Sequence, residues 1–143
     1  MSDLFNGNAQ FLIVDDSVVA RNEVRSVLNK LGFSNVDEAV DGRSAIERLK
    51  SMAKDDNPYM IVFLDLNMPG MDGLQTLDAI RADRDIKNTH VVVITTDNSK
   101  PTVIAAVMKG ISGYIVKPFS TDDIKKKLVE IFHRLETGLH GHN

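Results

Sequence analysis

Short apolar segments, each about the length of a single β-strand, recur along the chain. Four of them lack polar alternation and are rich in β-branched residues, a pattern typical of strands that are buried on both faces of a parallel sheet. They span residues 11–14, 59–64, 91–95 and 113–116. A weaker run at residues 36–40 indicates a fifth strand, which we expect at an edge of the sheet.

Helical patterns separate these predicted strands. Apolar residues recur at helical spacing within residues 20–31, 45–53, 74–80 and 124–135. A further helix is predicted between Ser99, a candidate N-cap, and Gly110, because Pro101 suits a first turn. Ser120 and Asp123 form a near capping box before the last helix. The alternation predicts an α/β protein with a doubly wound, five-stranded parallel sheet that has helices on both faces.

Length and composition fit one globular domain. The chain has 143 residues, of which 43% are hydrophobic and 26% are charged, which is ordinary for a domain with its own core. We expect an N-terminal extension over residues 1–9, the domain over residues 10–136 and a flexible tail over residues 137–143. The absence of cysteine excludes a disulfide scaffold, a thiol nucleophile, an iron–sulfur cluster and cysteine-ligated zinc.

The charge pattern and the N-terminal sequence limit the classes of partner and the cellular location that we expect. The net charge is −3, and the basic run at residues 125–127 follows two aspartates, which favours a solvated helix face over a nucleic-acid surface. The N-terminus lacks the pattern of a secretory signal, and the longest apolar runs are much shorter than a membrane span. We therefore expect a cytoplasmic protein that binds neither nucleic acid nor a membrane.

Polar residues of related chemistry lie at the ends of the predicted strands. Asp15 and Asp16 follow the first strand, and Asp65 follows the third. Thr95 ends the fourth strand, and Lys117 follows the fifth. Because ligands of an open α/β sheet bind outside the carboxyl ends of its strands, we expect these residues to meet in one site.

This combination favours metal-assisted phosphoryl transfer. Clustered carboxylates repel one another unless a cation neutralises them, and oxygen ligands without His or Cys favour Mg²⁺. A lysine and a threonine hydroxyl can bind a phosphoryl group, and an aspartate can accept it as an acyl phosphate. Asp65 is the candidate acceptor, with Asp15 and Asp16 as metal ligands. For the first loop alone, a simpler alternative is that Asp16 or Ser17 only caps the following helix.

Four segments together resemble the receiver domain of bacterial two-component response regulators: residues 14–17, 65–73, 94–96 and 113–119. The resemblance extends from Gln10 to Leu135, and within the family it is strongest to the stand-alone chemotaxis regulators. It implies a flavodoxin-like receiver fold with strand order 2-1-3-4-5. It also implies a phosphorylated signalling switch that catalyses its own phosphorylation and dephosphorylation, rather than a conventional enzyme.

The resemblance implies a role for each matched residue. Asp65 is the expected phosphoacceptor, and Thr95 and Lys117 are expected to bind the phosphoryl group. The residues expected to hold Mg²⁺ are Asp15, Asp16, Asp65 and, through its backbone carbonyl, Asn67. A cis bond is expected between Lys117 and Pro118. Tyr114 is expected to turn inward as Thr95 shifts, whereas without the resemblance a rim aromatic with its hydroxyl in water is the simpler interpretation.

Protein partners follow from the same resemblance. The expected phosphodonor is a sensor histidine kinase or a small acyl phosphate, and the expected state is a monomer. The expected target is a flagellar motor switch protein, contacted through Ala106, Val107, Lys109, Tyr114 and Lys127. A phosphorelay intermediate and a receiver of another two-component pathway are the alternatives. An aspartyl-phosphate phosphatase of the haloacid-dehalogenase type requires an Asp where Asn67 stands, and a flavodoxin-type binding module requires a phosphate loop after the first strand.

Overall fold

A parallel sheet of five strands forms the centre of the computed structural model, which describes residues 7–141 and, among their side chains, those of residues 7–137. The strands are β1 (Phe11–Val14), β2 (Val36–Ala39), β3 (Ile61–Leu64), β4 (His90–Thr95) and β5 (Gly113–Val116). Their order is β2-β1-β3-β4-β5, and all neighbouring pairs are parallel. The predicted strand order and the edge position of β2 are confirmed.

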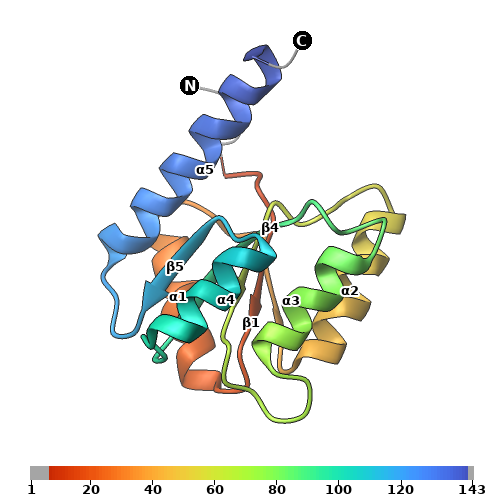
Figure 1. Ribbon diagram of the computed structural model, residues 1–143. Helices are drawn as coiled ribbons and strands as arrows, with labels where there is room; N and C mark the ends of the chain where they lie inside the picture. Colours follow the sequence, from red (N-terminus) through yellow and green to blue (C-terminus); the bar gives the residue numbers. More distant parts are fainter. Residues whose placement is uncertain (1–6, 142–143) are drawn as a thin grey trace.

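Helices follow each strand and cover both faces of the sheet (Figure 1). They are α1 (Val18–Lys30), α2 (Gly42–Lys54), α3 (Gly73–Ala82), α4 (Lys100–Lys109) and α5 (Thr121–Gly141). Alternate residues of β1 point to opposite faces, as the strand pleat requires. Phe11 and Ile13 lie in one core with α1 and α5, whereas Leu12 and Val14 lie in a second core with α2 and α3. The doubly wound architecture is therefore confirmed.

Most helix ends match the residues that predicted them. Ser17 caps α1 by accepting a hydrogen bond from Ala20 N at 3.2 Å, and Gly32 follows that helix with a φ of +97°, which glycine adopts without steric cost. Ser120 and Asp123 exchange the two hydrogen bonds of a capping box at the start of α5.

The start of α4 differs from the prediction. Ser99 occupies the N-cap position, but its side chain accepts no hydrogen bond from the helix backbone. Its hydroxyl instead donates to Thr102 Oγ1 at 2.8 Å, while its backbone N–H donates to the Asp97 carboxylate at 2.9 Å. The turn before α4 is therefore closed by Asp97 rather than by Ser99.

Some element boundaries also differ. β3 begins at Ile61 rather than at residue 59, because Tyr59 is buried by packing outside the strand ladder. Ala9, placed in the expected extension, is only 6% exposed and belongs to a core. Helix α5 continues to Gly141, past the expected end of the domain at residue 136. Residues 1–6 of the expected extension and 142–143 of the expected tail lie outside the described residues.

Among the described residues, no helix is both long and apolar enough to cross a membrane.

Candidate functional site

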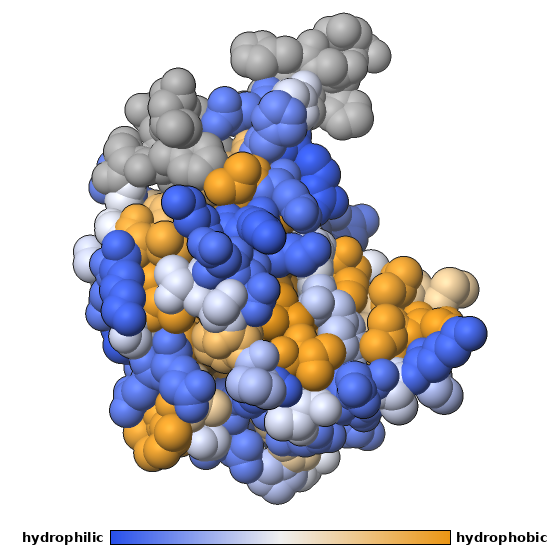
Figure 2. Space-filling model, turned by 90° about the vertical axis from the view of Figure 1, so that its left-hand side faces the viewer, coloured by the Kyte–Doolittle hydropathy of each residue, from blue (hydrophilic) through white to orange (hydrophobic). Residues whose placement is uncertain are grey.

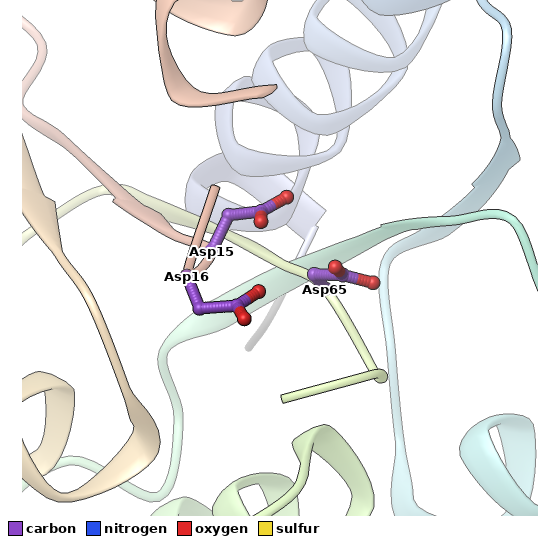
Figure 3. A group of neighbouring side chains, drawn as sticks. All are labelled: Asp15, Asp16 and Asp65. Atoms are coloured by element: carbon purple, nitrogen blue, oxygen red, sulfur yellow. The ribbon is translucent and has the colours of Figure 1, made fainter. Parts of the chain in front are cut away.

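Three aspartates from two neighbouring strands meet at the carboxyl edge of the sheet. Asp15 and Asp16 directly follow β1, and Asp65 directly follows β3, which pairs with β1. An oxygen atom from each carboxylate lies within 4.8 Å of the other two, and Figure 3 shows the three side chains projecting in the same direction. Asp15 and Asp65 are buried, whereas Asp16 is exposed. The expectation that these carboxylates meet is confirmed.

The capping alternative for this loop applies to Ser17 and not to Asp16. Ser17 is the N-cap of α1, and its backbone N–H also donates to Asp15 Oδ1 at 2.9 Å. The carboxylate of Asp16 therefore belongs to the acidic cluster rather than to the helix cap.

The cluster suits a hard divalent cation. Its members offer only carboxylate oxygens, which are the ligands that Mg²⁺ and Ca²⁺ prefer. Neighbouring negative charges at a largely buried position repel one another, and a bound cation relieves that repulsion. Because Asp16 is exposed, the site opens to water, which suits a small cation that keeps part of its hydration shell.

Lys117, which directly follows β5, reaches the same cluster. Its Nζ lies 2.9 Å from Asp15 Oδ2 and 3.6 Å from Asp65 Oδ2. Burial by itself favours the neutral amine, but the hydrogen bond to Asp15 and the charges of both carboxylates outweigh it and raise the pKa of Lys117. Lys117 is therefore a fixed cation between two carboxylates. The peptide bond between Lys117 and Pro118 is cis, as expected.

Burial dominates the electrostatics of Asp65. Burial, together with the charge of Asp15, raises the pKa of Asp65 above its ordinary value. The backbone N–H of Asn67, which donates to Asp65 Oδ1 at 3.2 Å, acts in the opposite direction but does not cancel the effect. The ionised carboxylate is thus held where its charge is only partly compensated, a condition common at functional sites.

Thr95 and Asn67 lie at the same edge of the sheet. Thr95, the last residue of β4, is fully buried. Its Oγ1 accepts hydrogen bonds from Asn67 Nδ2 at 3.5 Å and from Asp97 N at 3.4 Å. Both distances are at the long limit for a hydrogen bond. The Thr95 hydroxyl also acts as a hydrogen-bond donor toward the Asp65 carboxylate, which by itself lowers the pKa of Asp65.

Residues 11–129 match the family model of the response regulator receiver domain. The chain belongs to that family. It is 42% identical over 135 residues to the chemotaxis protein CheY-3 of Vibrio cholerae serotype O1, covering 94% of this chain and 100% of that relative. It is 38% identical over 126 residues to the chemotaxis protein CheY of Pseudomonas aeruginosa, covering 88% and 98%.

A solved structure supports the same assignment of the receiver domain. The CheX–CheY–BeF₃–Mg complex from Borrelia burgdorferi contains a chain that is 30% identical, with a TM-score of 0.80, covering 92% of this chain and 98% of that chain. Both the family and the flavodoxin-like receiver fold expected from the sequence are therefore confirmed.

Tyr114 of the receiver domain is partly buried on β5. Its hydroxyl donates to the backbone carbonyl of Asp97 at 2.5 Å, and its ring packs against the core beside α2 and α3. Burial and the charges of Asp97 and Asp65 raise the pKa of Tyr114. The simpler interpretation of a rim aromatic with its hydroxyl in water is wrong, and its role as a switch stays a prediction.

The expected partner-binding residues require one correction. Ala106 is the single buried residue of α4, a helix that lies wholly within the described part of the chain, and it is 0% exposed. It occupies the inward side of the helix, so it cannot contact a partner in this conformation. The exposed apolar residues of α4 are Ile104, Val107 and Met108, which are 51%, 56% and 81% exposed. The partner residues expected from the sequence included Val107 but neither Ile104 nor Met108.

The two lysines expected at the partner face are engaged on the surface. Lys109 Nζ lies 2.7 Å from Asp78 Oδ1, and Lys127 Nζ lies 3.4 Å from Glu130 Oε2.

Figure 2, which views the left-hand side of Figure 1, shows mostly hydrophilic side chains with separate apolar areas between them. Exposed apolar surface on this side is therefore local rather than continuous.

One contact at the site has no clear sequence signal. Arg21 Nη1 donates to the backbone carbonyl of Asp15 at 2.7 Å. On a helix, an arginine at this position is ordinarily a surface residue. The contact is recognised only from the packing of α1 beside β2. There the same guanidinium also donates to the Glu38 carboxylate.

Proposed function

We propose that this receiver domain is the phosphoacceptor switch of a chemotaxis-type two-component pathway, with Asp65 as the acceptor. The carrying observation is that Lys117 Nζ lies 2.9 Å from Asp15 and 3.6 Å from Asp65 within a cluster of three carboxylates. A fixed cation, a cation-binding pair and one buried nucleophile thus share one site. Family membership and the chemotaxis relatives support the proposal.

The proposed phosphodonor is a phosphohistidine on a sensor histidine kinase. A carboxylate oxygen of Asp65 attacks phosphorus as the P–N bond breaks, and the imidazole leaves with the bonding pair and takes a proton from solvent. The product is an acyl phosphate on Asp65. Lys117 pairs with one phosphoryl oxygen, and the Thr95 hydroxyl donates to another.

The proposed metal is Mg²⁺. The proposed ligands are Asp15, Asp16, Asp65 and the backbone carbonyl of Asn67. When bound, the cation offsets the charge that develops on the phosphoryl oxygens during transfer. The two ligands that precede α1 are adjacent in sequence, so one loop conformation positions both of them.

Phosphorylation is proposed to shift a two-state equilibrium at the face formed by α4, β5 and α5. Thr95 Oγ1 accepts from Asp97 N at 3.4 Å, and the Asp97 carbonyl accepts from the Tyr114 hydroxyl at 2.5 Å. Moving the Thr95 hydroxyl to a phosphoryl oxygen weakens its bond to the loop that holds Tyr114. The bond between the Thr95 hydroxyl and the phosphoryl group exists only in the switched state. Phosphorylation therefore interacts differently with the two states, which is what a population shift requires.

The proposed target is a flagellar motor switch protein, since the relatives are chemotaxis proteins. Its proposed contacts are Ile104, Val107, Met108, Lys109, Tyr114 and Lys127. In a pulldown, the phosphorylated chain should retain this target, and Asp65→Asn under the same conditions should not. Equal retention of the target by both proteins, or by neither, would contradict this part of the proposal.

Phosphotransfer from a kinase tests the chemical part. A chemotaxis-type sensor histidine kinase is first labelled on its histidine and is then mixed with the receiver and Mg²⁺. We expect the label to move to the wild-type chain and not to Asp65→Asn, in which the amide cannot act as the nucleophile. Equal labelling of Asp65→Asn would place the acceptor elsewhere.

A further inference from the structure

We propose that Arg21 is a positioning residue for the metal-binding loop, an inference that rests on the proposed function. Its guanidinium joins α1 both to β2 and to the loop after β1. Nε donates to Glu38 Oε1 at 2.7 Å, and Nη1 donates to the Asp15 carbonyl at 2.7 Å. The side chain of Arg21 is only 12% exposed, so both bonds are largely shielded from water and are stronger for it.

The Asp15 carbonyl needs such a donor because it lies beyond the strand ladder. The last registered pair between β1 and β3 joins Val14 to Leu64, and the Val14 carbonyl accepts from Asp65 N. Asp15 is 5% exposed, and a buried carbonyl without a donor is destabilising. Arg21 supplies the donor at the point where the sheet no longer does.

The planarity of the peptide bond makes this contact relevant to the metal site. The unit between Asp15 and Asp16 is rigid, so holding its carbonyl oxygen fixes the plane that joins the two carboxylate-bearing residues. The Asp15 backbone N–H donates to the Ala39 carbonyl at 3.2 Å, and the Asp15 carboxylate accepts from Ser17 N at 2.9 Å. Arg21 thus completes the set of bonds that orient this loop.

Arg25 provides a matched comparison. Glu38 Oε2 accepts from Arg25 Nε at 2.7 Å, and Arg25 Nη2 donates to the Val36 carbonyl at 2.8 Å. Burial raises the pKa of Glu38, but the hydrogen bonds and charges of both arginines outweigh it and lower that pKa overall. The two arginines therefore share one helix and one ionised partner. They differ in the second acceptor, which is the Asp15 carbonyl for Arg21 and the Val36 carbonyl of the edge strand β2 for Arg25.

Mg²⁺ affinity, measured by calorimetric titration of the full chain, tests the proposal. We expect Arg21→Ala to raise the Mg²⁺ dissociation constant about tenfold or more, as losses of groups that orient metal ligands do. Arg25→Ala should leave it unchanged, although it also removes a bond to Glu38. Wild-type affinity in Arg21→Ala, or equal losses of affinity in the two alanine variants, would overturn the proposal.

Lysine variants and a stability control complete the design. Thermal unfolding without Mg²⁺ establishes that each variant is folded at the titration temperature. If Arg21→Ala is unfolded, Arg21→Lys replaces it, because lysine keeps the charge but lacks the planar fork that reaches two acceptors at once. Arg21→Lys should then bind Mg²⁺ more weakly than Arg25→Lys, and equal affinities would overturn the proposal. Wild-type protein that binds no Mg²⁺ would overturn the proposed function as well.

Discussion

Asp65 is held at a position that disfavours its own charge. Its side chain is largely buried, and the nearby carboxylate of Asp15 adds repulsion, so the pKa of Asp65 is raised despite the approach of Lys117. Such a carboxylate is stabilised by any event that reduces or neutralises its charge, including protonation and the binding of a cation. The same imbalance has a measurable effect on stability.

Replacing Asp65 by Asn should stabilise the chain at neutral pH in EDTA. The folded-state pKa of Asp65 lies above its ordinary value of 3.8, so the folded protein binds this proton more tightly than the unfolded chain does. The contribution of this tighter proton binding to the free energy of unfolding is present below pH 3.8 and is lost as the pH rises through the folded-state pKa. Thermal unfolding from pH 3.5 to 7 should show the advantage of Asp65→Asn growing through that window.

Asp97 provides the control of opposite sign. The backbone hydrogen bond from Ser99 lowers the pKa of Asp97, so its contribution to stability is present at neutral pH and is lost as the pH falls through the lowered value. Asp97→Asn should therefore destabilise the chain at pH 7 and have little effect at low pH. If Asp65→Asn and Asp97→Asn shift stability in the same direction at pH 7, the assigned pKa directions are wrong.

Lys117 should matter for the rate of phosphorylation. Lys117→Met removes the cation that lies beside Asp15 and Asp65, and we expect phosphorylation by a small acyl phosphate to slow about 100-fold, as for other losses of one charge-stabilising group. Lys50→Met is the control, because Lys50 pairs with Asp83 and is largely exposed. Time courses at saturating Mg²⁺ measure both rates, and equal slowing in the two variants would contradict the role of Lys117.

The acidic and basic residues of the site could be predicted from sequence because each stands at the end of a strand. In a parallel sheet the carboxyl ends share one edge, so Asp15, Asp65 and Lys117 had to approach one another once the strands were recognised. Arg21 could not be found in this way. Its contact with Asp15 depends on how α1 packs against β2, which no local pattern of residues encodes.

Helix α4 is the least embedded of the elements near the site. Its single inward anchor is Ala106, and its C-terminal end is tied to α3 by the bond from Lys109 to Asp78 and by Arg81, which donates to the Gly110 carbonyl. The sequence predicted where this helix begins and ends more reliably than which side it buries, because its apolar residues occupy more than one face. The expectation that Ala106 contacts a partner came from the family resemblance, and its complete burial corrects that expectation.

Two lysine substitutions in α4 should separate the buried side from the exposed side. Met108→Lys should change the free energy of unfolding by about 0.5 kcal/mol or less, because Met108 is 81% exposed. Ala106→Lys should lower it by about 2 kcal/mol or more, because it forces a charged, bulky side chain into a packed position. Urea unfolding measures both, and similar losses in the two variants would contradict the burial of Ala106.

In the whole molecule, one edge of the sheet gathers residues that are distant in sequence. Lys117 Nζ contacts Asp15 across 102 positions, so the site exists only when β1, β3 and β5 are assembled. A ligand that binds this site therefore binds the folded chain and not the unfolded one, and its binding energy adds to the stability of the whole domain.

Mg²⁺ should accordingly raise the melting temperature. At a concentration 100 times the dissociation constant, the gain is about 2.7 kcal/mol, which corresponds to roughly 5–10 °C for a domain of this size. Asp16→Asn removes one ligand charge and should lose most of the shift. Asp85→Asn should keep it, because Asp85 lies in the segment that precedes β4, whereas the site lies beyond the carboxyl end of the sheet. Scans with Mg²⁺ and with EDTA measure the effect, and an equal shift in Asp16→Asn would contradict the proposed ligand set.

The architecture followed from the alternation of apolar strands with amphipathic helices, and the strand order required the family resemblance. The ends of the elements were harder to predict. A flexible tail was expected from residue 137, yet α5 continues to Gly141 because the backbone of a preceding helix can extend through residues of low propensity. Tyr59 looked like a strand residue because burial outside a strand leaves the same apolar signal.

The most direct test is the intact mass of the chain after incubation with acetyl phosphate. Wild-type protein and Asp65→Asn are compared in Mg²⁺ and in EDTA, and hydroxylamine is then added to identify an acyl phosphate. We predict one phosphoryl adduct in the wild-type chain that requires Mg²⁺, is removed by hydroxylamine and is absent from Asp65→Asn. An adduct that persists in Asp65→Asn, or wild-type protein that binds Mg²⁺ and still acquires no adduct, would contradict a Mg²⁺-dependent phosphoacceptor at Asp65.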